Sequence, residues 1–416
     1  MKSSIVKSYI LFALRLLLPL IVLPVLSHRL GAAGFGSVLA AQSLGLLGSL
    51  VVQFGFHHSA TRKLGLAEHP LEVDQIIGAV LAAQIVTAAL AAGLMLAGGA
   101  ASPVIGTDPV VLFSVLLVGL GAGMSPAWYF RGTGRAPTGI ALELAGQIIS
   151  FVAIVALVRG PDDLILTILL IGIGPALGAL IGIGWMLRER RCLIWPDFAT
   201  VGAQIAGSFA LFLVRASSTG MTIGAAWLAS LLMVPTEVAY FGVAAKIVSA
   251  LTMMSQPVLF AMLPVAARRA REGRRPLLKT ATKWAGLLLC LGLVSAVGVQ
   301  IFADLFLTVI FAPDMAAAGP VLRFLAWVCV LAALRDSLSD LVLVPMHRDK
   351  TVAACVIFGA GIALLMAFLL VPGSSAWSGA IGMASARMIG EAVTILFMSV
   401  AVARIAVSGG WAPPST

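Results

Sequence analysis

Apolar residues recur along almost the whole chain in runs that are long enough to cross a bilayer. Twelve such runs can be counted, and each approaches the ~20 residues that a helix needs to span the hydrocarbon core. Short polar connections separate them, the longest at about 58–75 and 264–282. This pattern predicts an all-α polytopic membrane protein whose function lies within the helical bundle. The predicted spans are 8–26, 37–57, 76–98, 110–130, 139–158, 164–187, 200–222, 237–263, 283–310, 319–346, 351–371 and 378–404.

The positive charges on the connections favour one orientation of these spans. With the N-terminus inside, the inner connections and tails hold 19 Lys and Arg, and the outer connections hold only Arg29 and Arg159. The positive-inside rule therefore predicts that both termini are cytoplasmic. Topology and anionic inner-leaflet lipid explain the net charge of +10, so we expect no nucleic-acid partner.

Composition argues against several other classes of protein. The chain is 60% hydrophobic and 11% charged, which is far more apolar than a soluble domain. Its four cysteines lie in predicted spans or an inner connection, so no disulfide framework is expected. The five histidines follow no metal-ligand spacing, and no pair of carboxylates or His/Asp group has a catalytic spacing. We therefore expect no enzyme activity, no cofactor and no bound metal.

The two halves of the chain resemble each other. A basic stretch at 188–198 separates six spans from six, and a shift of 206 residues aligns 35–63 with 241–269 without a gap, with 8 identities in 29 positions. Because six is even, both halves have the same orientation, as in a parallel repeat about an axis along the membrane normal. We therefore predict two pseudo-symmetric six-helix lobes, 1–190 and 191–416, around a central cavity, as in an alternating-access transporter.

Several motifs resemble those of bacterial polysaccharide flippases. Residues 17–37 combine a proline-bearing helix, a basic residue, a Leu-Gly turn and a glycine that starts the next helix. Residues 53–62 resemble the end of the family's second helix, and 237–246 resemble the start of its eighth. Residues 126–132 resemble a Trp-x-Phe-Gln-Gly element that closes the fourth helix, although Arg131 replaces the glutamine and Gly134 stands where an acidic residue is common.

The resemblance covers the whole chain and implies the multidrug/oligosaccharidyl-lipid/polysaccharide exporter superfamily. Within it, the chain is most similar to the flippases of O-antigen and exopolysaccharide repeat units. These move an undecaprenyl-diphosphate-linked oligosaccharide from the inner to the outer leaflet of the bacterial inner membrane. The resemblance also implies partners, namely membrane lipids and the glycosyltransferases and glycan polymerase of the same pathway. The related peptidoglycan lipid flippase usually has fourteen spans, which argues against that assignment.

Charged residues within the predicted spans are the candidate functional residues, because an unpaired charge at mid-membrane costs at least about 2.5–3.5 kcal/mol. Arg387 precedes Glu391 by four residues, and Arg335 has Asp336 and Asp340 nearby on one predicted helix. Residues spaced by three or four positions share a helix face. We therefore expect Arg335, Asp336, Asp340, Arg387 and Glu391 to form structural ion pairs.

Three further cations have no Asp or Glu within four positions: Arg15, Arg215 and Lys246. In flippases that this chain resembles, the first, seventh and eighth helices line the central cavity, so these cations are expected to bind the diphosphate of the substrate. Glu143, with Gln147 one turn on, is an isolated acid. It could couple transport to an ion gradient or pair with a distant cation.

Two alternatives remain open from the sequence. A drug or cation antiporter of the same superfamily needs acids facing its cavity, whereas the isolated charges here are mostly positive. An integral-membrane glycan polymerase or transferase is less favoured, because the chain has no long outer connection. The identity of the glycan, the coupling ion, the oligomeric state and the populated conformation are not encoded in any pattern found here.

Overall fold

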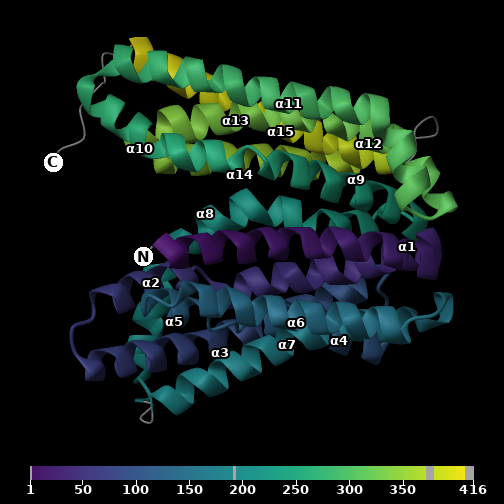
Figure 1. Ribbon diagram of the computed structural model, residues 1–416, viewed down its shortest axis with the longest axis horizontal. Coiled ribbons are helices and arrows are strands. Elements are labelled where there is room, and N and C mark those ends of the chain that lie inside the picture. Colours follow the sequence, from purple (N-terminus) through teal and green to yellow (C-terminus); the bar gives the residue numbers. More distant parts are fainter. Residues whose placement is uncertain (1, 191–193, 372–378, 408–416) are drawn as a thin grey trace. The chain divides into compact units, whose positions relative to one another are not determined.

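The computed structural model describes residues 2–190, 194–371 and 379–407, and in this part of the chain all regular secondary structure is helical. Side chains are described from Leu18 onward, except at 19, 20, 210, 214, 217–221, 260 and 405–407. The chain divides into two compact units, unit 1 (Met1–Val238) and unit 2 (Ala239–Thr416). Within each unit, long helices run side by side along a common direction (Figure 1).

Unit 1 holds α1 to α8 and the first residues of α9. The helices are α1 (Lys2–Gln53), α2 (Phe56–Leu66), α3 (Pro70–Ala101), α4 (Pro109–Gly123), α5 (Ala127–Gly132), α6 (Ala136–Leu157), α7 (Leu164–Glu189), α8 (Phe198–Ser230) and α9 (Pro235–Met253). A short 3₁₀ turn, Pro161–Asp163, precedes α7.

Unit 2 holds the remainder of α9 and the helices that follow. These are α10 (Gln256–Glu272), α11 (Arg274–Ile310), α12 (Gly319–Ala326), α13 (Val328–Leu338), α14 (Asp349–Leu370) and α15 (Gly379–Val407). A 3₁₀ segment, Pro313–Ala318, precedes α12. After α13 the chain passes through a π-helical turn, Ser339–Leu343, and a 3₁₀ turn, Val344–Met346.

The helices account for all twelve predicted spans. In the described residues, ten helical segments are long and apolar enough to cross a membrane. The first of these segments, Ile21–Leu66, covers the predicted span 37–57 and the end of the predicted span 8–26. Both spans belong to α1, which consists of two helices separated by a kink at Gly31, where the backbone φ is 65°. The N-terminal end of α1 and α2 consequently lie at the same end of unit 1 (Figure 1). The predicted seventh span corresponds to α8. The all-helical membrane fold is therefore confirmed.

The two units divide the helices differently from the predicted lobes. The predicted boundary lies at 190/191, whereas the compact units meet at 238/239, within α9. The reason is that α8 packs on the first helices through polar contacts at both of its ends. Ser59 and Ser208 are hydrogen-bonded at 2.9 Å, Ser102 and Ser230 at 2.7 Å. The pseudo-symmetry of 35–63 and 241–269 stays a prediction.

The residues of the 126–132 motif form the core at one end of unit 1. Trp128, Tyr129 and Phe130 of α5 are buried and pack with Phe54 and Phe56 at the α1–α2 break. Aromatic side chains of this size dominate the energetics of such a core. The motif therefore acts first as a packing element that holds α5 against α2.

Gly134 explains one departure from the flippase pattern. Its φ of 77° lies in the left-handed region, which glycine adopts at little cost and which a side chain with a Cβ disfavours. The chain turns here from α5 into α6, and the Arg135 amide donates to the Phe130 carbonyl at 2.6 Å. A glycine at 134 thus fits the local geometry of this tight turn.

Arg29 has a structural role that its position in a predicted outer connection did not indicate. Its Nη1 donates to the carbonyls of Ile154 at 3.0 Å and Val155 at 2.7 Å, and also to the carbonyl of Val158. Ile154 and Val155 lie in the last turn of α6, and Val158 is its C-cap. Carbonyls at a helix C-terminus generally lack intrahelical donors, although the Ile154 carbonyl also accepts from the Val158 amide at 3.1 Å. A cation at this end of a helix also interacts favourably with its dipole. Arg29 therefore ties the end of the first span to α6.

Replacing Arg29 by alanine should lower the thermal stability of the purified protein. The loss of a cation from a partly buried helix C-terminus is worth about 1–2 kcal/mol. Scanning fluorimetry in detergent measures the change, with Arg159→Ala as the control, since Arg159 also lies in a predicted outer connection. An Arg29→Ala melting temperature equal to that of Arg159→Ala would show that the contacts with α6 contribute nothing.

Candidate functional site

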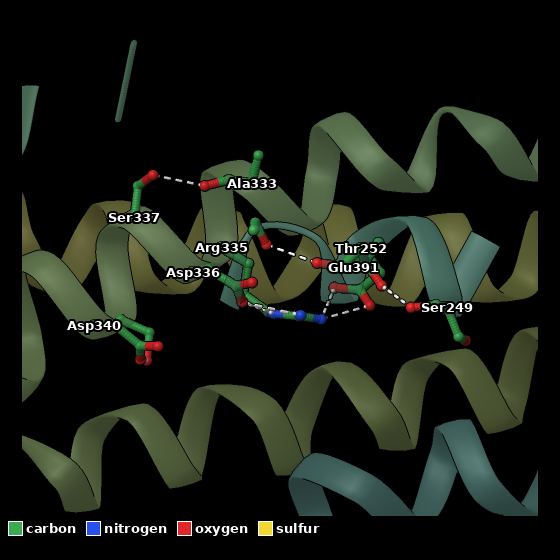
Figure 2. Close-up of polar contacts among 10 residues, drawn as sticks. Ser249, Thr252, Ala333, Arg335, Asp336, Ser337, Asp340 and Glu391 are labelled. Carbon is green, nitrogen blue, oxygen red and sulfur yellow. Dashed lines mark hydrogen bonds and ion pairs between the residues drawn. The ribbon is translucent and has the colours of Figure 1, made fainter. Parts of the chain in front are cut away.

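Charged side chains meet inside unit 2, where α13 faces α15. Arg335 of α13 lies between two carboxylates, those of Asp336 and Glu391 (Figure 2). Its Nη1 donates to both oxygens of Glu391 at 2.7 Å each, and its Nε donates to Oδ1 of Asp336 at 3.0 Å. The side chains of Asp336 and Glu391 are 13% and 16% exposed. We call these three residues, with Asp340 and Arg387, the charge network.

The network differs from the ion pairs expected from spacing in the partner of Glu391 and in the position of Asp340. Glu391 is bound by Arg335 rather than by Arg387, although Arg387 lies one turn away on α15. The Arg387 Nη1 is buried and has no hydrogen-bond partner among the described residues. Two hydrogen bonds from Nη1 of Arg335 to one carboxylate form a charge-assisted contact stronger than a neutral one, which explains why α13 supplies the partner.

Asp340 also lies apart from Arg335. Its Oδ1 accepts a hydrogen bond from the Ser339 hydroxyl at 2.8 Å, and Figure 2 shows it directed away from the Arg335 side chain. Asp340 belongs to the π-helical turn that follows α13. The wider turn changes the angular position of a residue four places on, so Asp336 and Asp340 do not stack as they would on an α-helix.

The charge network is not neutral when all its groups are ionised. Two arginines and three carboxylates, Arg335 and Arg387 against Asp336, Asp340 and Glu391, give two minus three, or one negative charge. Ionised groups in apolar surroundings are retained where they are paired and hydrogen-bonded. One additional proton or monovalent cation would make the network neutral. The arrangement is therefore suited both to bracing α13 against α15 and to holding one positive charge.

A second group of charges lies on unit 1, where α2, α5 and α8 come together. His58 of α2 is exposed, and Arg131 and Arg215 lie on α5 and α8, two helices that contact α2 here. Arg62 follows His58 by one helical turn and is exposed as well. Arg131 and Arg215 are partly buried. We call these four residues the cationic surface.

Arg15, Arg215 and Lys246 were expected to bind the diphosphate of the substrate. Arg15 lies on α1, but its side chain is outside the described part. Arg215 belongs to unit 1 and Lys246, which is partly buried on α9, belongs to unit 2. Their placement in one cavity stays a prediction. His58 and Arg62 were not singled out from sequence, and Arg131 was noted only as a departure from the flippase motif; the spacing of His58 and Arg62 on one helix face was the available signal.

Glu143 and Gln147 lie on α6, one turn apart. Glu143 Oε1 accepts a hydrogen bond from the Ser125 hydroxyl at 2.7 Å, which joins α6 to the segment between α4 and α5. Gln147 Oε1 is buried without a hydrogen-bond partner among the described residues. Burial of a polar oxygen in this state is costly. Both residues are partly buried, and Glu143 contacts the segment that leads into α5.

Comparison with known proteins identifies relatives over the full length of the chain. The family of polysaccharide biosynthesis proteins matches residues 6–269, more than half of the sequence. A protein of Shigella dysenteriae named "Putative O-antigen transporter" is 25% identical over 415 residues, which are 97% of this chain and 100% of the relative.

Two solved structures share the fold. The lipid II flippase MurJ in an inward closed conformation superposes with a TM-score of 0.73 at 12% identity, covering 97% of this chain and 88% of MurJ. An inward-facing multidrug resistance transporter of the MATE family, within the MOP superfamily, gives a TM-score of 0.69 at 14% identity, covering 95% and 96%. At these identities the likeness establishes the fold, which flippases and drug exporters have in common.

The charge network can be tested as a structural brace. Arg335→Met should destabilise the protein by about 2–4 kcal/mol, because Glu391 and Asp336 are left without their cation. Adding Glu391→Met to it should recover part of that loss. The control is Asp304→Asn, which removes the more exposed partner of Arg323 in the same unit and should change stability by less than about 1 kcal/mol. Equal melting temperatures for Arg335→Met and Asp304→Asn would contradict this role.

Proposed function

The chain belongs to the polysaccharide biosynthesis protein family, and we propose that it is a flippase for a lipid-linked oligosaccharide. The observation that carries the proposal is the similarity along 97% of the chain to a protein named as an O-antigen transporter. The chain shares its fold with a lipid II flippase, so the fold is compatible with this class of cargo without identifying it. The substrate is an undecaprenyl-diphosphate-linked repeat unit, moved from the inner to the outer leaflet of the bacterial inner membrane by alternating access.

The diphosphate is the part of this cargo whose transfer across the bilayer costs the most free energy without the protein. Its charges lose their hydration when they enter a low-dielectric slab, and fixed cations along a water-filled path offset that loss through charge-assisted hydrogen bonds. Arg15, Arg215 and Lys246, at intervals within the first, seventh and eighth predicted spans, are the proposed ligands. Glu143, with Gln147, is a proposed ion-coupling group.

The topology and partners follow from the same proposal. Both termini lie in the cytoplasm, in agreement with the distribution of 19 inner and two outer loop cations. The chain itself catalyses no covalent step. Glycosyltransferases on the inner side supply the lipid-linked unit, and a glycan polymerase on the outer side consumes it. A search for such genes beside this one is a direct check of the pathway.

An antiporter for drugs or organic cations has less support. The MATE-family transporter shares the fold, but a common fold does not identify a cargo. An organic cation needs carboxylates on its path. In the charge network, Asp336 and Glu391 are already bonded to Arg335, and Arg131 and Arg62 add positive charge to the surface of unit 1.

The cationic site can be tested in cells. Arg215→Ala should reduce complementation of a flippase-deficient strain by about 10- to 100-fold, because one charge-assisted contact with the diphosphate is worth about 1.5–3 kcal/mol. Arg215→Lys should retain part of the activity if charge alone is needed, and little if both guanidinium N–H groups bind phosphate. Immunoblots of the membrane fraction establish that the variants are inserted equally. Full complementation by Arg215→Ala would remove Arg215 from the substrate path.

A further inference from the structure

The connection between α7 and α8 lies against α3. Residues 194–197 have no regular secondary structure, and they meet α3 at Gly78. A Cβ on Gly78 would overlap the carbonyl oxygen of Ile194 and would lie 3.0 Å from its carbonyl carbon and 3.7 Å from Cδ of Pro196. Glycine permits this close approach of two backbones. Gly78 therefore forms a notch that holds the backbone of residues 194–198, which we call the strap.

Polar contacts hold the chain on both sides of the notch. Arg190, the C-cap of α7, forms an ion pair with Asp74 of α3 at 3.9 Å. Asp74 precedes Gly78 by four residues, so the two lie on one face of α3. At the other end of the strap, Asp197 caps α8 by accepting a hydrogen bond from the Thr200 amide at 3.0 Å. The strap therefore belongs to unit 1 and is fixed within it.

The side chains of the strap are alternately covered and uncovered. Ile194 and Pro196 are partly buried, whereas Trp195 and Asp197 are exposed, as expected of an extended segment that lies on a surface. Trp195 is 62% exposed, and Phe198 at the end of the strap is 96% exposed. Two aromatic side chains are thus presented outward from a fixed backbone. Exposed apolar groups gathered in this way mark an interaction surface.

The position of the strap along α3 places these aromatic side chains at the edge of the bilayer. Gly78 is the third residue of the predicted span 76–98, so Ile194 lies level with the first turn of that span. Arg190 meets α3 at Asp74, before the span, and Ile194 meets it at Gly78, within the span. Four residues of helix correspond to about 6 Å along its axis. The chain therefore dips toward the hydrocarbon core before α8 begins.

The surface around the strap is apolar, which points to lipid rather than to a water-filled path. Ile85 follows Gly78 by seven residues, two turns along the same face of α3, and is exposed. On α7, the helix that precedes the strap, Ile181 and Trp185 are exposed as well. A path for water or for a charged cargo is lined by polar groups. Apolar side chains exposed at this level are those that acyl chains cover.

We propose that the strap is a membrane anchor: Trp195 and Phe198 insert into the inner leaflet, and Gly78 sets the depth at which they do so. The leaflet is the one that the loop cations make the inner one. An indole ring suits this level because its apolar body lies among acyl chains while its N–H reaches headgroups and water. The inference concerns the lipid around the protein and does not depend on which cargo the protein moves.

The anchor has a consequence for the connection between the two halves of the sequence. The strap follows the sixth predicted span and precedes the seventh, a place where a free linker between lobes was expected. Because it is tied both to α3 and to lipid, it moves with unit 1. The boundary between the compact units falls later, at 238/239, so the strap is not the junction between them.

The depth of Trp195 can be measured by fluorine NMR on the full-length protein, labelled with fluorotryptophan, in nanodiscs of phosphatidylethanolamine and phosphatidylglycerol. Trp195→Phe identifies the resonance of Trp195. Two paramagnetic probes are compared: a phospholipid with a nitroxide at the top of its acyl chain, and a gadolinium chelate confined to water. We expect the nitroxide to remove most of the Trp195 intensity and the chelate to remove little. An equal or greater loss with the chelate would place the strap in water, as a surface for a soluble partner, and would overturn the inference.

Gly78→Ala tests the notch. The added Cβ overlaps the Ile194 carbonyl, so the strap must shift away from α3, and the loss of Trp195 intensity with the chelate should rise roughly twofold. Gly93→Ala is the matched control on the same helix, because a Cβ there meets no atom within 4 Å, and it should behave as the wild type.

The resonance of Trp227, whose Nε1 donates to the Gly98 carbonyl at 3.0 Å, reports in the same spectra that unit 1 stays folded. Asp74→Asn removes the ion pair with Arg190 without adding volume. It should change the Trp195 resonance in the same direction as Gly78→Ala, and it serves if Gly78→Ala is not inserted. A Trp195 response in these variants equal to that in Gly93→Ala would show that α3 does not set the depth of the strap and would overturn that part of the inference.

Discussion

The cost of removing charge from water is the constraint on which this structure depends. Arg335 is retained inside unit 2 because two carboxylates accept its hydrogen bonds, at 2.7 Å from Glu391 and 3.0 Å from Asp336. Arg29 meets the same requirement without an acid, since backbone carbonyls at the end of α6 accept its protons. Both contacts join segments that are far apart in sequence, so the requirement to solvate a cation also determines which helices lie together.

The cationic surface of unit 1 meets that constraint in a different way. Arg62 and Arg131 reach no carboxylate among the described residues, and His58 and Arg62 are exposed. Such charges stay hydrated until an anion replaces the water. A surface of this kind is suited to a ligand that brings its own negative charge, whereas the charge network of unit 2 is largely satisfied internally. The two units therefore differ in how their charges are compensated: Arg62 and Arg131 of unit 1 reach no carboxylate among the described residues, whereas Arg335 of unit 2 is held by ion pairs within its own unit.

Hydropathy and loop charge predicted the helices well because they report on the bilayer, which acts on each span separately. The turn at Gly31 was also readable, since a Leu-Gly step within an apolar run indicates a break. Contacts between helices could not be predicted from the sequence in this way. The Arg387–Glu391 spacing pointed to a pair on one helix, but Arg335 reaches Glu391 from α13. The predicted lobe boundary followed the position of the basic stretch and stays a prediction; the contacts of α8 with α2, such as Ser59–Ser208, lie within unit 1.

The cationic surface likewise depends on contacts between helices that the sequence did not predict. His58 and Arg62 are four residues apart in the sequence, but nothing in the sequence indicated that the helices carrying Arg131 and Arg215 pack against α2. That proximity depends on α5 being held by its buried aromatic residues and on the close approach of α8 at Gly55. Cations suited to a diphosphate could therefore be predicted from the sequence, whereas which of them lie on neighbouring helices depends on the packing of α2, α5 and α8.

The central claim is that this protein moves a lipid-linked oligosaccharide between leaflets, and it can be measured directly. The purified protein is reconstituted into vesicles that contain a fluorescent undecaprenyl-diphosphate oligosaccharide in both leaflets, and a membrane-impermeant reductant bleaches the label that is exposed outside. Vesicles with the protein should lose nearly all fluorescence, because label from the inner leaflet is brought out, while protein-free vesicles should lose about half. Loss of only half in the presence of folded protein, under an imposed proton gradient of either direction, would contradict the account.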